Sequence, residues 1–333
     1  MKLLVTGGAG FIGSTYVRVA LDARPDDELV VLDKLTYAGR RENLSDVEDR
    51  IAFVEGAIED PDAAREAMQG CDAVVNFAAE SHVDRSIADQ DAFARTHVIG
   101  TSVLLDAARE LGVSRYVQVS TDEVYGSIQE GSFTETSPLN PSSPYSATKA
   151  AGDLLVSAHV HTYGLEALIC RGSNNYGPRQ YPEKLIPLMV LNAIHGDSLP
   201  VYGDGRQVRN WLYVEDFCRG IHTVLEKGKP GEAYNVGGPD ECENIEVVKR
   251  VIELTGADES LIEYVKDRPG HDRRYSLSSE KLKRDLGWEA EVHFAEGLER
   301  TVEWYRENED WWGPIRSGEY REYYEKQYGQ ALG

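Results

Sequence analysis

Cysteine is scarce, and nothing in its spacing suggests a disulfide or a metal centre. The 333 residues contain four cysteines, which are Cys71, Cys170, Cys218 and Cys242. They are far apart and form no CxxC pair, which indicates reduced thiols in a cytoplasmic protein. Histidine adds no site, because His159 and His161 stand two residues apart on a predicted helix and do not share a face. We therefore expect no bound metal.

Basic residues are also few compared with acidic ones. Lys and Arg total 35 against 57 Asp and Glu, which gives a formal net charge of −22. Such a field repels nucleic acid and anionic membranes, so we expect neither as a partner. An anionic substrate would need local arginines of its own. Adaptation to high salt and general solubility would both explain the acidic excess.

Long apolar runs are missing as well. No stretch reaches the roughly 18 apolar residues that a membrane span requires. The chain opens with Lys2-Leu3-Leu4-Val5-Thr6, which predicts a strand, so we expect no signal peptide and a cytoplasmic location. Hydrophobic residues still make up 41% of the chain, which is enough for a globular core.

The short apolar runs that are present alternate with helical patterns through the first half of the chain. This alternation predicts an α/β fold with a doubly wound parallel (Rossmann-type) sheet. The runs are uniformly apolar, as in strands that are covered on both faces. The predicted strands are Leu3–Thr6, Leu29–Leu32, Ile51–Val54, Ala73–Phe77, Tyr116–Ser120 and Leu165–Ile169, and helices are predicted at Phe11–Leu21, Ala63–Met68 and Gly100–Leu111. Ligands of such a sheet bind at the carboxyl ends of its strands.

The pattern changes after Tyr176, where glycine and proline become frequent and the strands become short. We expect residues 1–176 to form the Rossmann domain and residues 177–333 to form a smaller mixed α/β region that binds the substrate. A helix over Val214–Leu225 and a strand over Ala233–Val236 are expected to return to the first domain, so that 210–237 belongs to it.

A glycine-rich segment, Thr6-Gly7-Gly8-Ala9-Gly10-Phe11-Ile12-Gly13, follows the first strand and opens a helix. Glycines at Gly7, Gly10 and Gly13 allow a tight turn and a close approach to a pyrophosphate at the helix N-terminus. Asp33 ends the second predicted strand, where a carboxylate binds ribose hydroxyls and repels a 2′-phosphate. The expected cofactor is therefore NAD, although Lys34 is a cation that could tolerate that phosphate.

Two side chains suited to hydride chemistry follow later. Tyr145 and Lys149 are four residues apart, so on a helix they share a face. A tyrosine with a pKa of ~10 needs a large downward shift to act as a base near neutrality. We expect Lys149 and the positive nicotinamide ring to supply that shift by stabilising the phenolate.

A pair of carboxylates stands at the end of another predicted strand, in Thr121-Asp122-Glu123. Neighbours in a strand point to opposite faces, so both can meet one substrate only where the backbone turns. A solvated loop with Asp122 as a helix cap is the simpler interpretation of such a pair. Its position beside the Tyr145 motif favours a catalytic role.

These groups imply an ordered reaction. Tyr145 removes a hydroxyl proton as hydride passes from C4 of a hexose to NAD. The new ketone acidifies C5, where Glu123 acts as base, while Asp122 stays protonated and donates to the departing C6 hydroxyl. Hydride then returns to C6, and the cofactor ends unchanged.

Several motifs of the chain resemble one family in order and almost from end to end. They are TGGAGFIGS, SHVDRS, STDEVYG, PYSATKA, NNYGP, PEKLIPL and HDRRYS. They are similar to those of the dTDP-glucose 4,6-dehydratases, which are lyases (hydro-lyases) of the extended short-chain dehydrogenase/reductase family. The resemblance implies NAD as cofactor, a nucleotide-sugar substrate and a role in deoxysugar biosynthesis. It also implies a homodimer formed through helices near Thr96–Glu110 and Ala147–Tyr163.

The resemblance assigns further site residues. Besides the catalytic Thr121, Asp122, Glu123, Tyr145 and Lys149, the NAD site would include Gly7, Gly10, Phe11, Ile12, Gly13, Asp33, Lys34, Leu35, Thr36, Ala57, Ile58, Phe77, Ala78, Ala79, Glu80, Ser81, Thr96, Tyr145, Lys149 and Asn175. Ser81, Thr121 and Asn174 would hold the hexose. The nucleotide base would lie among Lys184, Leu185, Ile186, Pro187, Leu188, Met189, Pro200, Val201 and Tyr202. The ribose and diphosphate would meet Arg209, Asn244, Arg268, Pro269, Gly270 and His271.

Three positions depart from the family pattern. Ala57 replaces an aspartate that contacts adenine, so we expect weaker NAD binding. His97 replaces an asparagine, and Arg179 stands where an aromatic residue is usual. None of the three is expected to touch the four reacting groups.

Other functions compete with dehydration. A nucleotide-sugar 4-epimerase or a uronate decarboxylase of the same fold would also use NAD with Tyr145 and Lys149. Those enzymes typically carry a serine-rich segment in place of Thr121-Asp122-Glu123, and epimerisation needs no acid/base pair. UDP-glucose could replace dTDP-glucose, because one methyl group discriminates by only ~1–3 kcal/mol. A non-enzymatic NAD-binding sensor would have no use for the reacting groups.

Overall fold

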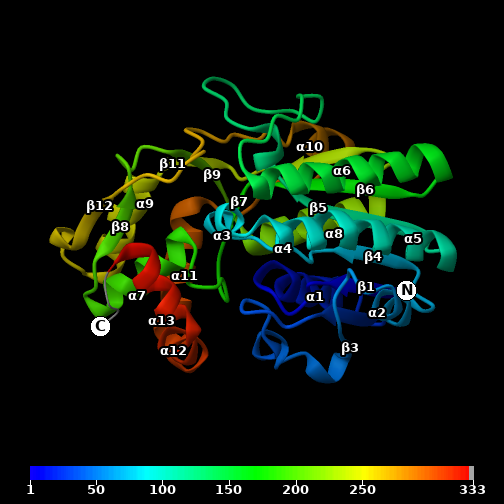
Figure 1. The fold of residues 1–333 in the computed structure, drawn as a ribbon, viewed down its shortest axis with the longest axis horizontal. Coiled ribbons are helices and arrows are strands. Elements are labelled where there is room, and N and C mark those ends of the chain that lie inside the picture. Colours follow the sequence, from blue (N-terminus) through cyan, green and yellow to red (C-terminus); the bar gives the residue numbers. More distant parts are fainter. Residues whose placement is uncertain (330–333) are drawn as a thin grey trace.

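A parallel sheet sandwiched between helices forms the larger part of the molecule (Figure 1). The computed structural model describes residues 1–329, so the last four residues of the expected substrate region lie outside the described part. The large sheet has seven strands in the order β10-β6-β5-β4-β1-β2-β3, all of them parallel. The predicted doubly wound α/β fold is therefore confirmed.

The strands of this sheet agree with the predicted runs to within a few residues. They are β1 (Lys2–Thr6), β2 (Glu28–Asp33), β3 (Ile51–Glu55), β4 (Ala73–Asn76), β5 (Arg115–Thr121), β6 (Ala167–Gly172) and β10 (Ala233–Val236). The main difference is at β6, which starts two residues later than predicted. Gly164 ends the preceding helix in a left-handed conformation with φ of 69°, and the chain needs two more residues to reach the sheet.

Alternate side chains of the strands enter two separate cores. Leu3 and Val5 of β1 pack with helices α1 (Phe11–Ala23) and α8 (Val214–Lys227) on one face. Leu4, between them, packs on the other face. The helices of that face are α2 (Pro61–Met68), α5 (Thr101–Leu111) and α6 (Pro144–Tyr163). Uniformly apolar strands are thus explained by burial on both sides.

A second region, formed by residues 174–213, 240–265 and 294–328, holds two small sheets. One has the order β11-β9-β7 and the other pairs β12 with β8. Their bounds are β7 (Asn174–Tyr176), β8 (Leu199–Tyr202), β9 (Val208–Tyr213), β11 (Asp240–Glu243) and β12 (Ile262–Val265). The predicted return to the large sheet is present, because α8 packs on that sheet and β10 pairs with β6.

Helices complete both regions. The remaining α-helices are α3 (Val83–Ala88), α4 (Gln90–Ala94), α7 (Leu185–His195), α9 (Asn244–Thr255), α10 (Glu280–Leu286), α11 (Phe294–Glu307), α12 (Glu309–Ser317) and α13 (Glu319–Tyr328). The short helical turns are η1 (Arg41–Leu44), η2 (Glu48–Arg50), η4 (Asp122–Tyr125) and η5 (Glu259–Leu261), and η3 (Arg95–Gly100) is a π-helical turn that runs into α5. Among the described residues, no helix combines the length and apolarity needed to cross a membrane.

Candidate active site

One cavity opens at the carboxyl ends of the large sheet. Part of its wall consists of residues that end or directly follow strands of this sheet, namely Gly7, Asp33, Phe77, Thr121 and Gly172. Residues of the second region, Lys184 and Leu185 among them, complete the opposite wall. The cavity therefore lies where the doubly wound topology places a ligand.

The glycine-rich loop leaves no room for side chains. A Cβ on Gly13 would stand 2.2 Å from the carbonyl oxygen of Gly7, and a Cβ on Gly7 would stand 2.6 Å from the nitrogen of Ala78. Gly7 also has a φ of +66°, which favours glycine. Helix α1 starts directly after Gly10 with no side-chain cap from a described residue. Its first N–H groups suit a phosphate group.

Asp33 is tied to this loop. Its Oδ2 accepts a hydrogen bond from the nitrogen of Ala9 and its Oδ1 from the nitrogen of Leu35, both at 2.9 Å. Burial raises the pKa of Asp33, and the two backbone bonds oppose the rise. Asp33 lines the cavity while it holds the loop in shape.

Lys34 lies between two carboxylates. Its Nζ is 3.4 Å from a carboxylate oxygen of Glu59 and 3.4 Å from one of Glu80, and it also donates to the hydroxyl of Thr96 at 3.2 Å. All four residues line the cavity. The positive charge of Lys34 is thus balanced within the protein.

Several buried polar atoms of the cavity wall lack a hydrogen-bond partner in the part of the chain that the structure describes. They are Oε2 of Glu59, Oγ of Ser120, Oδ2 of Asp122, Oδ1 of Asn174, Oδ1 of Asn175, Oε1 of Gln180 and Nε1 of Trp211. Buried polar groups are normally satisfied. Their concentration around one cavity indicates a site for a polar ligand, and the glycine cradle beside them fits a dinucleotide.

The two carboxylates come together because the chain turns at the end of β5. The hydroxyl of Thr121 accepts a hydrogen bond from the nitrogen of Glu123 at 3.2 Å, which caps η4. Burial, and then the charge of Glu123, raise the pKa of Asp122 to about 8, although Arg209 and Thr121 oppose the rise. Burial also raises the pKa of Glu123, against the charges of Arg268, Lys184 and Arg209.

Helix α6 carries the other two reacting groups. Ser143 and Ser146 form a capping box around Pro144, which fixes the start of the helix. Tyr145 and Lys149 are both buried and both line the cavity. Lys149 donates from Nζ to the carbonyl oxygen of Val119 at 2.7 Å, and burial lowers its pKa to about 8.

The structure shows which groups oppose ionisation of Tyr145. Burial, and then the charge of Glu123, raise its pKa, while hydrogen bonding with Thr121 opposes the rise. The carboxylates of Asp122 and Asp153 add to the rise. The protein groups alone therefore raise this pKa. The predicted fall includes the charge of the nicotinamide ring and stays a prediction.

His97 also differs from the expectation, because it does touch a reacting group. Its ring lies edge-on to the ring of Tyr145, with centroids 5.7 Å apart, and Phe93 completes the cluster. Nδ1 of His97 is 2.8 Å from the hydroxyl of Thr148. Burial and the neighbouring Lys149 charge hold the pKa of His97 well below its usual value, so it is neutral at physiological pH.

Most of the residues assigned to NAD lie in the cavity. The wall contains Gly7, Gly10, Phe11, Ile12, Gly13, Asp33, Lys34, Thr36, Ile58, Phe77, Ala78, Ala79, Glu80, Ser81, Thr96, Tyr145, Lys149 and Asn175. Leu35 and Ala57 are not part of it. Leu35 packs against the core beside β1. The carbonyl oxygen of Ala57 accepts from Asp60, in the turn that leads into α2.

The residues assigned to the nucleotide sugar divide into two groups. Ser81, Thr121, Asn174, Lys184 and Leu185 line the cavity. Ile186, Leu188, Met189 and Val201 are instead buried in the core of the second region. The cavity wall also excludes Pro187, Pro200, Tyr202, Arg209, Asn244, Arg268, Pro269, Gly270 and His271.

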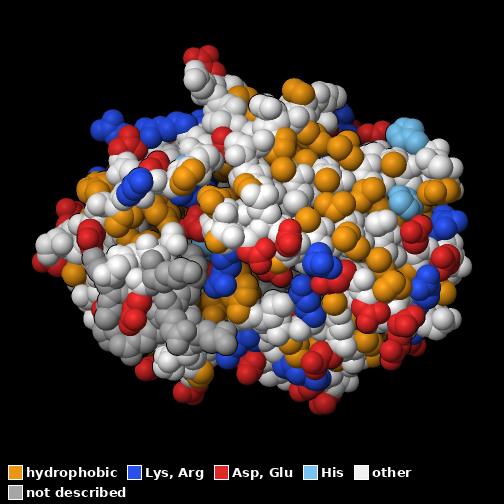
Figure 2. All heavy atoms as spheres, in the orientation of Figure 1, with side chains coloured by type: hydrophobic (Ala, Val, Ile, Leu, Met, Phe, Trp, Pro, Cys, Tyr) orange, Lys and Arg blue, Asp and Glu red, His pale blue; other side chains and the backbone are white. Residues whose placement is uncertain are grey.

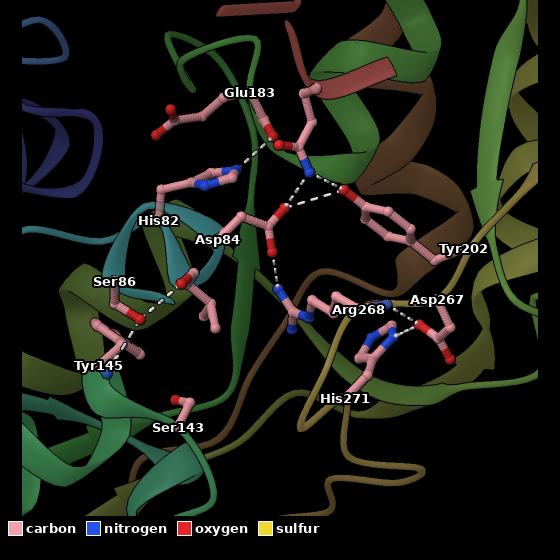
Figure 3. Close-up of polar contacts among 12 residues, drawn as sticks. His82, Asp84, Ser86, Ser143, Tyr145, Glu183, Tyr202, Asp267, Arg268 and His271 are labelled. Atoms are coloured by element: carbon pink, nitrogen blue, oxygen red, sulfur yellow. Dashed lines mark hydrogen bonds and ion pairs between the residues drawn. The ribbon is translucent and has the colours of Figure 1, made fainter. Parts of the chain in front are cut away.

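Some of these outlying residues form a polar cluster at the edge of the second region (Figure 3). Asp84 accepts from Arg268 at 3.1 Å and from the hydroxyl of Tyr202 at 3.0 Å. Nδ1 of His271 is 2.6 Å from Asp267, and burial lowers the pKa of His271 to about 4. Arg209 donates to the carbonyl oxygens of Val208 and Asp272.

The structure adds cavity residues that the sequence analysis did not name. Glu183 accepts from Tyr37 at 2.8 Å and from Arg85 at 3.2 Å, and it lines the cavity beside Lys184. Its position in the PEKLIPL motif could have identified it as a site residue from the sequence. Glu59, Gln180 and Trp211 also line the cavity, and no local pattern marks them.

Comparisons with known proteins point to one family. Residues 4–301 match the family described as GDP-mannose 4,6 dehydratase. A dTDP-glucose 4,6-dehydratase from Streptomyces niveus is 50% identical over 323 residues, covering 95% of this chain and 96% of the relative. The solved dTDP-glucose 4,6-dehydratase of Streptomyces venezuelae, which has NAD bound, shares 55% identity with a TM-score of 0.93, over 95% of this chain and 100% of that one.

A UDP-glucose 4-epimerase from Thermus thermophilus in complex with NAD is also similar. It shares 34% identity with a TM-score of 0.86, over 92% of this chain and 100% of the other. The dehydratases are thus more similar in sequence than this epimerase, and they carry the name that the motifs predicted. The resemblance is confirmed, and the chain belongs to the GDP-mannose 4,6 dehydratase family, as a relative of the dTDP-glucose 4,6-dehydratases.

Proposed function

We propose that this chain is an NAD-dependent hydro-lyase that converts dTDP-glucose to its 4-keto-6-deoxy sugar. One observation carries the proposal. A single cavity contains Tyr145 and Lys149, which suit oxidation of an alcohol, together with Asp122 and Glu123, which suit elimination of water. Few reactions use both sets of groups.

The cofactor site fits NAD. The glycine loop and the start of α1 would receive the pyrophosphate, and Asp33 would meet the adenine ribose. Glu59 and Glu80 flank Lys34, so a 2′-phosphate would meet more negative than positive charge. This balance supports NAD over NADP. The chemistry that NAD supplies when bound is reversible hydride acceptance.

Tyr145 and Lys149 would act on the C4 hydroxyl of the sugar. Tyr145 takes the hydroxyl proton as C4 is oxidised. Because the pKa of Tyr145 is raised, its phenolate is a strong base but is costly to form. A positive charge near the phenol must therefore stabilise the phenolate. Lys149 is the cation on the same face of α6, and it can provide that charge.

Asp122 and Glu123 would divide the elimination between them. With a pKa of about 8, Asp122 is mostly protonated at pH 7, roughly ten molecules for each ionised one. It can donate that proton to the departing C6 hydroxyl. The pKa of Glu123 is raised, which makes its carboxylate a stronger base for C5, and the charges of three cations limit the rise.

The positive charge needed to bind a substrate diphosphate comes from side chains near the carboxylates. Arg209, Arg268 and Lys184 all act on Glu123, so they lie near the carboxylates in spite of the net charge of −22. Arg268 keeps a buried Nε without a partner among the described residues. We assign the diphosphate to the two arginines, since guanidinium groups recognise phosphate well. Residues 1–176 with 210–237 would hold NAD, and 177–333 would hold the nucleotide.

An apolar surface supports a homodimer. Figure 2 shows hydrophobic side chains gathered over the face formed by α4, α5 and α6. Large apolar side chains remain exposed on α6 and on two elements that contact it, α3 and η3. They are Leu154 and Tyr163 of α6, Ile87 of α3 and Ile99 of η3, with 41 to 62% of their surface accessible. Contact between two copies through this face would bury them. All four cysteines are free, which agrees with the proposed cytoplasmic location.

The test uses substrate labelled with deuterium at C4. dTDP-glucose and UDP-glucose are incubated separately with the enzyme, and the products are analysed by NMR and mass spectrometry. Label at C6 of a 4-keto-6-deoxy product is expected with dTDP-glucose. Label that stays at C4 of a galacto product would instead identify a 4-epimerase and refute the proposal. Faster turnover of UDP-glucose would correct the nucleotide.

A further inference from the structure

A buried ion pair lies directly behind the reacting groups and outside the cavity lining. Asp153 stands on α6, one helical turn after Lys149, and Arg171 stands on β6, in register with Ser120 of β5. Nε of Arg171 donates to Oδ2 of Asp153 at 2.9 Å. The two side chains expose only 7% and 2% of their surface, so both charges are withdrawn from water.

A hydrogen bond connects this ion pair to η4, the element that carries Asp122 and Glu123. Nη1 of Arg171 donates to the hydroxyl of Tyr125 at 2.8 Å, and the guanidinium group lies 5.0 Å from the centre of the tyrosine ring. The Tyr125 hydroxyl donates in turn to Asn235 of β10 at 2.8 Å. Tyr125 is the last residue of η4, which begins with Asp122. One network therefore joins α6, β6, η4 and β10.

Stability alone does not explain a pair in this place. Two charges lose their hydration when they are buried, and apolar side chains of similar size often stabilise a protein as well or better. An apolar pair would, however, remove a negative charge from the neighbourhood of Lys149. It would also remove the donor that holds Tyr125. Both losses would fall on the reacting groups.

Lys149 depends on that negative charge. Burial lowers the pKa of Lys149, and the Asp153 carboxylate is the charge that opposes the change. The hydrogen-bond acceptor of Nζ is a neutral carbonyl group, that of Val119. Other titratable groups around Lys149, or around the Asp153 pair, are His97 of η3, Tyr145 of α6, Cys170 of β6, Tyr125 of η4, and Asp122 and Glu123 of η4.

We propose that Asp153 and Arg171 are positioning residues of the reaction, which keep Lys149 charged and hold η4 in place beside Tyr145. The inference rests on the proposed function, because Lys149 and the carboxylates of η4 act only within it. Arg171 has both tasks. It keeps Asp153 ionised, since a buried carboxylate without a cation tends to take up a proton, and it anchors η4 through Tyr125.

The first test follows the charge of Lys149 directly. Holoenzyme is labelled with ¹³C at the lysine Cε, and the Lys149 signal is identified by its loss in Lys149→Arg. The pH of its transition is expected to fall by about one unit in Asp153→Asn and in Arg171→Gln. The double variant Asp153→Asn with Arg171→Gln removes both charges together and leaves no unpaired buried ion. If a single variant does not fold, the double variant tests the same shift.

A matched control is Asp197→Asn. It breaks the part-buried ion pair between Asp197, which follows the end of α7, and Arg316 of α12. It should lower Tm without moving the Lys149 transition. A folded Asp153→Asn or double variant with the wild-type transition would overturn the electrostatic part of the proposal.

The second test separates position from charge. Tyr125→Phe loses the bonds to Arg171 and Asn235 but keeps the ion pair. Its kcat is expected to fall about ten- to a hundredfold because Asp122 and Glu123 lose their alignment, while KM and the Lys149 transition stay constant. A wild-type kcat would overturn the anchoring part. If the wild-type enzyme did not dehydrate dTDP-glucose, the proposed function would fail, yet the Lys149 shift would still report on Asp153.

Discussion

Arg268 donates a hydrogen bond from Nη1 to Oδ1 of Asp84 at 3.1 Å, and so joins the segment after β12 to helix α3 (Figure 3). Burial raises the pKa of Asp84, but the charges of His82 and Arg268 outweigh it and the pKa ends below its ordinary value. Arg268 is also the cation that most strongly opposes the rise in the pKa of Glu123. One arginine thus serves the proposed diphosphate site and the proposed base.

Arg268→Gln is therefore expected to change both binding and pH dependence. KM for dTDP-glucose should rise at least about tenfold, because a charge-assisted contact to phosphate is lost. The pKa of Glu123 should rise, since its main opposing charge is gone. Glu123 acts as a base only when ionised, so the acidic limb of the kcat profile should move to higher pH. Both are read from steady-state kinetics over a range of pH.

The matched control for that variant is Arg273→Gln. Arg273 pairs with Asp204 on the surface, and both side chains are more than half exposed. Its loss should leave KM and the acidic limb where they are in the wild-type enzyme. If Arg268→Gln behaved like this control, Arg268 would have neither of the assigned roles.

The carboxylates around Lys34 lead to a prediction about cofactor choice. Glu59→Gln with Glu80→Gln would remove both charges that balance Lys34. The freed ammonium group should then attract a 2′-phosphate, so the ratio of Kd for NADP to Kd for NAD should fall about tenfold or more. Calorimetric titration of the two cofactors measures the ratio. An unchanged ratio would show that Asp33 alone excludes NADP.

The exposed apolar face leads to a prediction about assembly. Leu154 has 62% of its surface accessible and Ile99 has 50%. Leu154→Glu with Ile99→Glu would place two charges in the proposed interface, so light scattering should show a monomer in place of a dimer. Tyr264→Glu is the control, because Tyr264 is 60% exposed but lies on β12 of the second region. A wild-type molecule that is monomeric at micromolar concentration would refute the dimer.

The sequence predicted those parts of the site that depend on short stretches of chain. The glycine loop, the strand end at Thr121 and the spacing of Tyr145 and Lys149 are local features, and each has one fold-compatible placement. Short apolar runs, which are also local features, placed the strands of the large sheet. The carboxyl ends of those strands then meet at one edge, which brings together residues that are far apart in sequence.

Packing between distant segments could not be predicted in this way. His97 touches Tyr145 because η3 lies against α6, and no spacing in the sequence reports that contact. The rise in the pKa of Tyr145 comes from burial and from the Glu123 carboxylate, and burial depends on how distant segments pack. The family resemblance assigned the segment from Leu185 to Met189 to the nucleotide base. Most of it packs into the second core because α7 is covered by α9 and α11.

The final prediction separates the two halves of the chemistry. Glu123→Gln removes the proposed C5 base but leaves Tyr145 and Lys149 in place. Oxidation at C4 should continue while loss of water falls by about 10²–10⁴, so a 4-keto hexose should accumulate on the enzyme. Acid quenching followed by reduction with borodeuteride places deuterium at C4 of that sugar, and mass spectrometry counts it, up to about one per active site.

Tyr145→Phe should give the opposite result. Without the phenolic oxygen the proton of the C4 hydroxyl has no acceptor, so no ketone forms and borodeuteride adds no label. Glu130→Gln, in the exposed loop after η4, is the control for the glutamine substitution and should turn over like the wild type. Normal turnover in Glu123→Gln would transfer the role of base to another group. Asp122 would not be that group while its pKa of about 8 keeps it protonated at pH 7.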